Sequence, residues 1–251
     1  MEIITTTTDS QYDEYKSLIL KRDELKKKAF QYQEDYYREF GNLLKESFTL
    51  KVECISLKKK ISYCQMCVNQ NKKIISSELD AHIEIVMQEY HEELDELIKH
   101  VKFANEVTSI TIEDLQEIKK IYRHIVKKIH PDMNPELFKL DDVKELWNRT
   151  RIAYTCNDLK GLQEIQILVD ALDTNITTVQ IEHINEKIDE IKKEIDTILN
   201  TNPYQYKYLL EDTEEVHHKK SELKDEIKEY IAYKKQLETL FSQYDIKQYH
   251  S

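Results

Sequence analysis

Apolar residues recur at alternating spacings of three and four along several long stretches of the chain, as they do in coiled coils. These stretches are 50–68, 79–101, 181–198 and 216–241. A polar run at 69–73 separates the first two. Pro203 separates the last two, because proline breaks a helix interior and disfavours helical geometry in the residue before it. The pattern therefore predicts two antiparallel coiled-coil hairpins, at 9–105 and 176–251.

Several positions within these hairpins admit more than one interpretation. Gly41 is expected to mark a kink in the first helix. Lys220 and Lys234 occupy apolar positions of the last seam, where polar residues set helix register or oligomeric state. The segment 204–210 is rich in tyrosine and is either a packed corner or an exposed contact surface, with the corner preferred. The seams also leave open a homodimer formed through the coiled coils.

Turn-forming residues are scarce, which narrows the fold class. The 251 residues include only 2 Gly and 3 Pro, whereas average usage is about 7% and 5%. Phosphate-binding loops and dinucleotide folds need several glycines close together, and β-sandwiches and barrels need many tight turns. We therefore predict an all-α, elongated protein, with a small helical domain at 106–175 between the two hairpins.

The charge balance argues against two classes of partner. The net charge is −11, which disfavours nonspecific binding to nucleic acid or to anionic membranes. No run approaches 18 apolar residues, and the first residues lack the features of a signal peptide. We therefore expect a cytoplasmic protein with no membrane contact.

Cysteine and histidine pairs could suggest metal or redox chemistry. Cys64 and Cys67 form a C-x-x-C sequence, but no second pair accompanies it. Cys54 and Cys64 lie in seam positions, so buried thiols are preferred to a zinc or redox site. His217 and His218 lack nearby ligands in the sequence and are expected to be solvated. No metal and no cofactor is predicted.

The middle of the chain carries the most specific signal. Thr111 and Asp114 form a capping box that opens a helix. One side of this helix is apolar and the other is basic, although the protein as a whole is acidic. The helix is expected to end at His130, because Pro131 disfavours helical geometry in the residue before it. The basic side consists of Lys119, Lys120, Arg123, His124, Lys127 and Lys128.

Residues 121–135, with the sequence IYRHIVKKIHPDMNP, resemble the second helix and the His-Pro-Asp loop of the J domain in DnaJ-type co-chaperones. Trp147 stands where the family usually has phenylalanine, and Ala153 and Tyr154 match its Ala-Tyr pair. The resemblance covers about 60 residues. The flanking stretches resemble only generic coiled coils.

This resemblance implies a partner, a DnaK-type heat-shock chaperone, whose ATP hydrolysis is accelerated when the loop and the basic helix dock on it. A cluster of cations suits electrostatic steering to an acidic groove, and an aspartate can form a charge-assisted bond with the partner. The chemistry would be the partner's, so the chain is expected not to be an enzyme. The implied docking residues are His130, Pro131, Asp132, Lys119, Arg123, His124, Lys127 and Asn134.

The sequence also departs from the family pattern. The family's first helix is not recognisable, and its place could be taken by the end of the helix through Leu97 and Val101, or in part by Phe103. Met133 stands where a basic residue is usual. A second interpretation is therefore a coiled-coil scaffold with a degenerate J-like domain. In the first interpretation the coiled coils would select a client protein whose identity the sequence does not reveal. The sequence contains no arrangement of catalytic residues that would support a hydrolytic enzyme.

Overall fold

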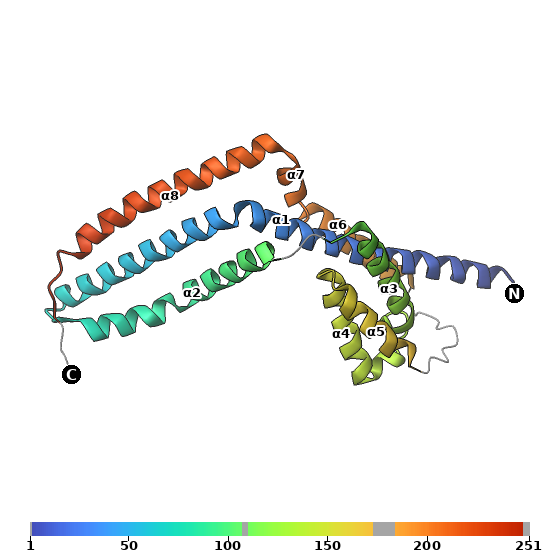
Figure 1. The fold of residues 1–251 in the computed structure, drawn as a ribbon. Coiled ribbons are helices and arrows are strands. Elements are labelled where there is room, and N and C mark those ends of the chain that lie inside the picture. The colour runs from blue at the N-terminus through green and yellow to red at the C-terminus, as the bar shows by residue number, and fades with distance from the viewer. Residues whose placement is uncertain (1, 107–109, 173–183, 248–251) are drawn as a thin grey trace. The chain divides into compact units, whose positions relative to one another are not determined.

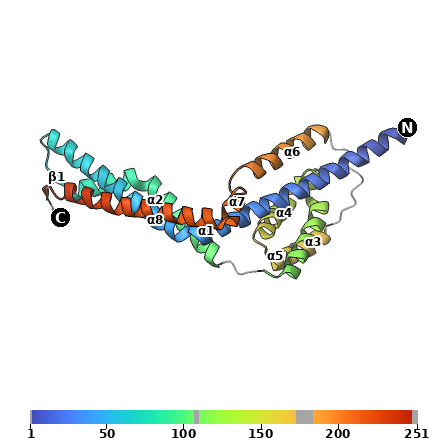
Figure 2. The same cartoon turned by 90° about the horizontal axis from the view of Figure 1, so that it is seen from above.

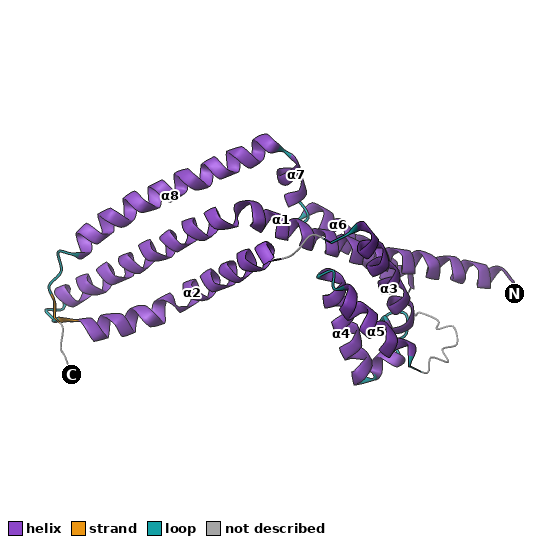
Figure 3. Cartoon of the chain, viewed as in Figure 1, coloured by secondary structure: helices purple, strands orange, loops and turns teal. Residues whose placement is uncertain are grey.

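The computed structural model describes residues 2–106, 110–172 and 184–247, most of which are helical (Figure 1 and Figure 3). The all-α class predicted from the sequence is confirmed. The only sheet among these residues is a parallel pair of two-residue strands, β1 (Ile74–Ile75) and β2 (Ile246–Lys247). A 3-10 turn, η1 (Leu137–Lys139), lies between α3 and α4. The helices are α1 (Glu2–Asn69), α2 (Ser76–Glu106), α3 (Ile112–Ile129), α4 (Asp141–Thr155), α5 (Leu159–Asp170), α6 (Ile184–Asn200), α7 (Tyr206–Glu211) and α8 (Thr213–Phe241).

The chain forms two compact units, and neither is a continuous segment. Unit 1 comprises Met1–Gln33 and Thr108–Tyr206. Unit 2 comprises Glu34–Val107 and Lys207–Ser251. Helix α1 contributes its first half to unit 1 and its second half to unit 2. This division differs from the three consecutive segments expected from the sequence.

Unit 1 is built around α3, α4 and α5, and its core includes residues of α1 and α6. The apolar stripe of α3 is buried as predicted. From α4 the core takes Leu146, Trp147, Ala153 and Tyr154, and from α5 it takes Leu162, Ile165 and Val169. A continuous apolar core thus supports the loop that joins α3 to α4.

The first half of α1 packs in the core of unit 1. Tyr15 and Ile19 are almost fully buried in the same core as α3, α4 and α5. The sequence had suggested Leu97, Val101 or Phe103 for this role. That expectation is wrong, because those three residues belong to unit 2 and not to the unit 1 core.

Helix α6 also packs in unit 1, where it runs alongside α1 in the same direction (Figure 2). Gln11 bonds Asn185 near the start of α6, and Lys26 pairs with Glu194 further along. The buried residues of α6 are Ile188, Ile191 and Ile195, which the heptad seam had predicted. Ile181, the first residue of that seam, lies outside the described residues.

The expected pairing of α6 with α8 is not found, since the two helices belong to different units. Helix α8 instead runs parallel to the second half of α1 (Figure 2), since residues 39, 47 and 53 of α1 contact residues 220, 226 and 234 of α8. The two lysines in its apolar seam have partners on α1: Lys220 pairs with Glu39, and Lys234 lies 2.8 Å from Glu53. These lysines therefore sit between helices as ion pairs, which explains how the seam tolerates them.

In unit 2, α2 folds back along the second half of α1 after a polar turn at 70–73, as the sequence predicted. A shared core contains Cys64, Cys67 and Met87. Cys54 is also buried, and burial raises the pKa of the Cys54 and Cys64 thiols. Buried, protonated thiols fit the interpretation preferred from the sequence.

Close packing against α2 requires glycine at position 41, and α1 continues through this residue. A Cβ atom there would lie 2.8 Å from a γ-carbon of Val101 on α2. Gly41 thus permits a close approach of two helices. At the other predicted special segment, Tyr204 packs edge-on against Tyr32 at 5.5 Å, as a packed corner requires, whereas Tyr208 is exposed.

Candidate functional site

The basic helix α3 begins and ends as its sequence dictates. The Thr111 hydroxyl accepts a hydrogen bond from the Asp114 amide at 3.1 Å, which confirms the predicted cap. Acidic residues occupy the first turn and lysines the last turn, as the helix dipole favours. His130 has extended backbone geometry and ends the helix just before Pro131. The loop of interest therefore begins at a well-defined helix terminus.

His130 is anchored inside unit 1 and is only 1% exposed. Its Nδ1 atom accepts a hydrogen bond from the Asp132 amide at 3.2 Å. Its ring meets Trp147 edge-on, with ring centres 4.7 Å apart. Burial lowers the pKa of His130 to about 4, although the nearby carboxylates of Asp132 and Asp23 act in the opposite direction. The imidazole is therefore neutral near pH 7, and its acceptor nitrogen fixes the loop.

His130 packs against a stack of aromatic rings. Trp147 stacks on Tyr122, with ring centres 6.3 Å apart, and Tyr122 stacks closely on Tyr154 at 3.7 Å. The ammonium group of Lys27, on α1, lies over the Tyr154 ring at 4.1 Å from its centre. His130, Trp147, Tyr122 and Tyr154, four of the residues that carry the resemblance, thus form one contiguous stack, and Lys27 of α1 lies at its far end.

Asn134 and Met133 are buried and stabilise the loop. The Asn134 side-chain amide donates to the backbone oxygens of Lys127 at 3.1 Å and Lys128 at 2.8 Å. These carbonyls are otherwise open at a helix end, so Asn134 caps α3. The side chain of Asn134 is thus engaged in structure, although the sequence had assigned it to docking. Met133 is buried in the core, which explains an apolar residue where the family usually has a basic one.

Asp132 is partly open to solvent, with a side chain 38% exposed. Its Oδ2 atom lies 3.9 Å from Nδ1 of His130. The buried Tyr15 of α1 is close enough to this carboxylate to be affected by its charge. Burial, together with that carboxylate, raises the pKa of Tyr15. The Asp132 carboxylate thus affects a buried tyrosine and is itself partly open to water.

The basic side of α3 is partly engaged by acids of the same unit. Lys119 pairs with Glu24 of α1 at 2.9 Å. His124 and Lys128 both lie 2.6 Å from Asp170 at the end of α5. Two further docking candidates, Arg123 and Lys127, lie one helical turn apart and are exposed. The structure therefore brings the eight predicted residues together on α3 and its loop, but they differ in accessibility.

Sequence reasoning missed the residues of α1 and α5 that contact this site. Tyr15, Arg22 and Asp23 lie about 100 positions before the loop, and each resembles an ordinary helix residue when considered alone. Their spacing of seven and eight positions does place them on one face of α1. That periodicity is the only signal in the sequence, and it does not identify the helix against which this face packs.

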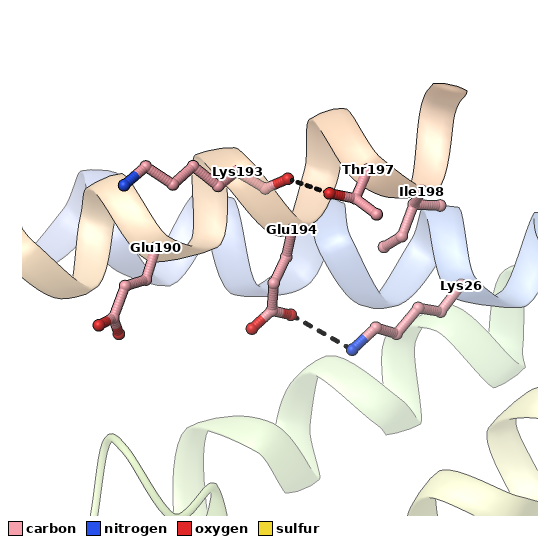
Figure 4. Close-up of a pocket in the computed structure, with 6 residues that line it drawn as sticks. All are labelled: Lys26, Glu190, Lys193, Glu194, Thr197 and Ile198. Carbon is pink, nitrogen blue, oxygen red and sulfur yellow. Dashed lines mark hydrogen bonds and ion pairs between the residues drawn. The ribbon is translucent and has the colours of Figure 1, made fainter. Parts of the chain in front are cut away.

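A separate pocket of about 510 Å³ lies between α1 and α6 and contains none of the predicted docking residues (Figure 4). Its lining includes Lys26, Lys193, Glu190 and Glu194, and Lys26 pairs with Glu194 at 3.4 Å. These opposite charges balance, so the pocket does not concentrate charge of one sign.

Searches for other site types were confined to the described part of the chain. Within 2–106, 110–172 and 184–247, no cluster of three His, Cys, Asp or Glu residues is arranged to hold a metal ion. Among the helices described, none combines the length and the apolar character needed to cross a membrane.

Comparisons with known proteins give no family assignment. No family model matches the chain, and neither a curated protein nor a solved structure matches it significantly. The functional argument therefore depends on the residues and geometry described above.

Proposed function

We propose that this protein is a cytoplasmic co-chaperone of the J-domain type, which docks on a DnaK-type chaperone and stimulates its ATP hydrolysis. The main support is the loop at the end of α3. There, His130 is locked in the core by Trp147 and by the Asp132 amide, while the Asp132 carboxylate remains partly exposed. A fixed backbone with a solvent-facing carboxylate suits recognition by a partner's cation or amide.

The charges of α3 provide the second part of the docking surface. Arg123 and Lys127 are exposed and lie on the side of the helix that also carries Lys119. Such cations accelerate encounter with an acidic groove and orient the partner, even where they add little to final affinity. The reaction is the partner's ATP hydrolysis, so this chain requires no nucleophile, metal or cofactor of its own. Unit 2 would bind the client protein or a larger complex.

The decisive experiment is single-turnover ATP hydrolysis by a cognate DnaK-type chaperone. The wild-type protein should raise the rate severalfold, and Asp132→Asn should remove most of that stimulation because it removes the exposed charge. Asp142→Asn is the matched control, since Asp142 is exposed in the first turn of α4 and outside the docking surface. Unchanged hydrolysis with the wild-type protein would contradict the proposal, as would equal stimulation by the Asp132→Asn variant.

A scaffold with a degenerate J-like domain is the second candidate, and one observation favours it. Three of the basic side chains on α3, those of Lys119, His124 and Lys128, already pair with Glu24 or Asp170. A scaffold would tolerate their replacement together with Asp132, whereas a co-chaperone would lose stimulation. The same hydrolysis assay, repeated with Arg123→Gln and Lys127→Gln, separates the two.

A further inference from the structure

Acidic side chains from two other helices of unit 1 lie at the two edges of the basic side of α3. Glu24 of α1 lies 2.9 Å from Lys119. Asp170, the last residue of α5, lies 2.6 Å from both His124 and Lys128. With 3.6 residues per turn, positions 119 and 128 are half a turn apart around the helix, so the two acids act on opposite edges of the basic side.

The cations between these edges remain accessible. Arg123 and Lys127 lie between positions 119 and 128 around the helix, and both are exposed. Their positions are about 6 Å apart along the helix axis. Lys120 is exposed on the same side, but it pairs with Glu117 of its own helix at 3.6 Å. Arg123 and Lys127 therefore form a narrow basic strip.

Both acids at the edges are charged near neutral pH. Bonds from Lys128 and His124 lower the pKa of Asp170, and the bond from Lys119 lowers the pKa of Glu24. The dipole of α5 disfavours a negative charge at its last residue, so the basic residues of α3 stabilise Asp170 there. Partly exposed ion pairs of this kind add little to stability, and their main effect is on the electric field around α3.

We propose that Glu24 and Asp170 determine the specificity of docking, because they confine it to the strip formed by Arg123 and Lys127. The partner that fits this strip carries two acidic groups about 6 Å apart, rather than a broad acidic surface. This inference rests on the proposed co-chaperone function for the identity of the partner, although the arrangement of charges does not depend on that function.

Repulsion between like charges provides the selectivity. A partner with a broad acidic surface brings carboxylates close to Glu24 or Asp170, which costs free energy. A partner whose acids lie only opposite the strip avoids this cost and still forms charge-assisted bonds with Arg123 and Lys127. The two edge acids thus exclude wrong partners without contacting the right one.

The first test replaces each acid with its uncharged amide and titrates the stimulation of a DnaK-type chaperone. Asp170→Asn and Glu24→Gln each free basic side chains, so each should lower the half-maximal concentration about twofold to fivefold, with the maximal rate unchanged. Glu164→Gln is the control on α5, where Glu164 is exposed. Glu14→Gln is the control on α1, since it breaks a 2.8 Å pair with Lys192 of α6. Both controls should match the wild type.

The second test does not involve a chaperone. Its probe is labelled poly-glutamate, a polyanion that presents a broad acidic surface, and binding is followed by fluorescence anisotropy at low salt. The double variant Glu24→Gln with Asp170→Asn should bind the probe about threefold more tightly than Glu14→Gln with Glu164→Gln, which has the same net charge. The difference should disappear as salt screens the charges. Circular dichroism shows that the variants compared are folded.

The outcomes separate this inference from the function on which it rests. If the wild type stimulates but the edge-acid variants match their controls in either test, the inference fails alone. Weaker docking by Asp170→Asn or Glu24→Gln would also overturn it, since the acids would then orient their basic partners for docking. If the wild type does not stimulate a competent chaperone, the proposed function fails. Tighter poly-glutamate binding would then still support a restricted basic strip, and equal binding would overturn the inference as well.

Discussion

The Tyr122 hydroxyl and the Asp23 carboxylate share a 2.6 Å hydrogen bond across 99 positions of sequence. The Asp23 side chain is only 11% exposed, and Arg22 contacts its other oxygen at 3.0 Å. This small network joins α1 to α3. Tyr122 is buried and Asp23 is mostly covered, so removal of either partner leaves the other without its bond in a site that water scarcely reaches.

Tyr122→Phe should therefore lower the free energy of unfolding of unit 1 by about 1–3 kcal/mol. Trp147 is the single tryptophan of the sequence and lies in unit 1, so its fluorescence during urea unfolding reports on this unit alone. Tyr208→Phe, which changes an exposed tyrosine, serves as the control. Equal stability of the wild type and Tyr122→Phe would show that the bond contributes nothing.

The buried His130 should make unit 1 sensitive to mild acid. Burial lowers its pKa from 6.5 to about 4. Between these values the unfolded chain binds more protons than the folded one, so stability rises with pH across the window and is lost as pH falls from 6.5 to 4. The effect amounts to at most about 3 kcal/mol.

This dependence is measured by following Trp147 fluorescence in urea at several pH values. The wild type should lose stability toward pH 4 more steeply than His130→Gln, which has no titrating ring. Carboxylates titrate in both proteins, so the difference between the two curves isolates His130. Parallel curves would contradict the assignment of a buried, neutral imidazole.

Lys27 should make stability depend on pH in the alkaline range, in the same direction as His130 does in the acidic range. It is 4% exposed, and its ammonium group has no hydrogen-bond partner among the described residues. Burial, followed by repulsion from Lys119, lowers its pKa from 10.5 to about 8. The unfolded chain then binds more protons between pH 8 and 10.5, so this group adds stability as pH rises through that range.

The measurement compares the wild type with Lys27→Met from pH 7.5 to pH 10. The stability of the wild type should increase relative to the variant by at most about 3 kcal/mol. Lys26→Met is the control because Lys26 is the exposed neighbour on the same helix. A constant difference between the wild type and Lys27→Met would place the charged group in water.

Gly41→Ala should destabilise unit 2, although alanine normally stabilises a helix interior by about 1 kcal/mol relative to glycine. The new methyl group would lie 2.8 Å from one γ-carbon of Val101 and 3.0 Å from the other, so the helices must separate. The expected loss is about 1–3 kcal/mol, as for other overpacked cores.

The double variant Gly41→Ala with Val101→Ala should recover part of this loss, because it removes the clashing branch. Helicity monitored by circular dichroism reports the change, while the Trp147 transition of unit 1 provides an internal reference. A more stable Gly41→Ala protein would show that the space beside Gly41 is open.

The sequence predicts helices well here because their signals are local. Thr111 and Asp114 cap α3, Pro131 ends it, and the isoleucines at 188, 191 and 195 mark the buried side of α6. None of these signals says which helix covers an apolar face. The seam of α6 fits α8 as well as α1, and only tertiary packing assigns it to α1.

The same distinction explains what was found at the candidate site. The loop and the basic side of α3 are contiguous in sequence, so composition and spacing are enough to find them. Glu24 and Asp170, which neutralise part of that side, look like ordinary surface acids on distant helices. Their role follows from the fold, and no local pattern encodes it.

The division of α1 between two units has a consequence for synthesis on the ribosome. Tyr15 and Ile19 emerge early, but the stripe of α3 that buries them is complete only at Ile129. At roughly 5–20 residues per second, that delay is roughly 5 to 20 seconds. Folding of unit 2 is completed later, because β1 pairs with β2 and this pairing requires Ile246. A nascent chain with an exposed apolar face over this interval is itself a candidate for transient protection by cellular chaperones.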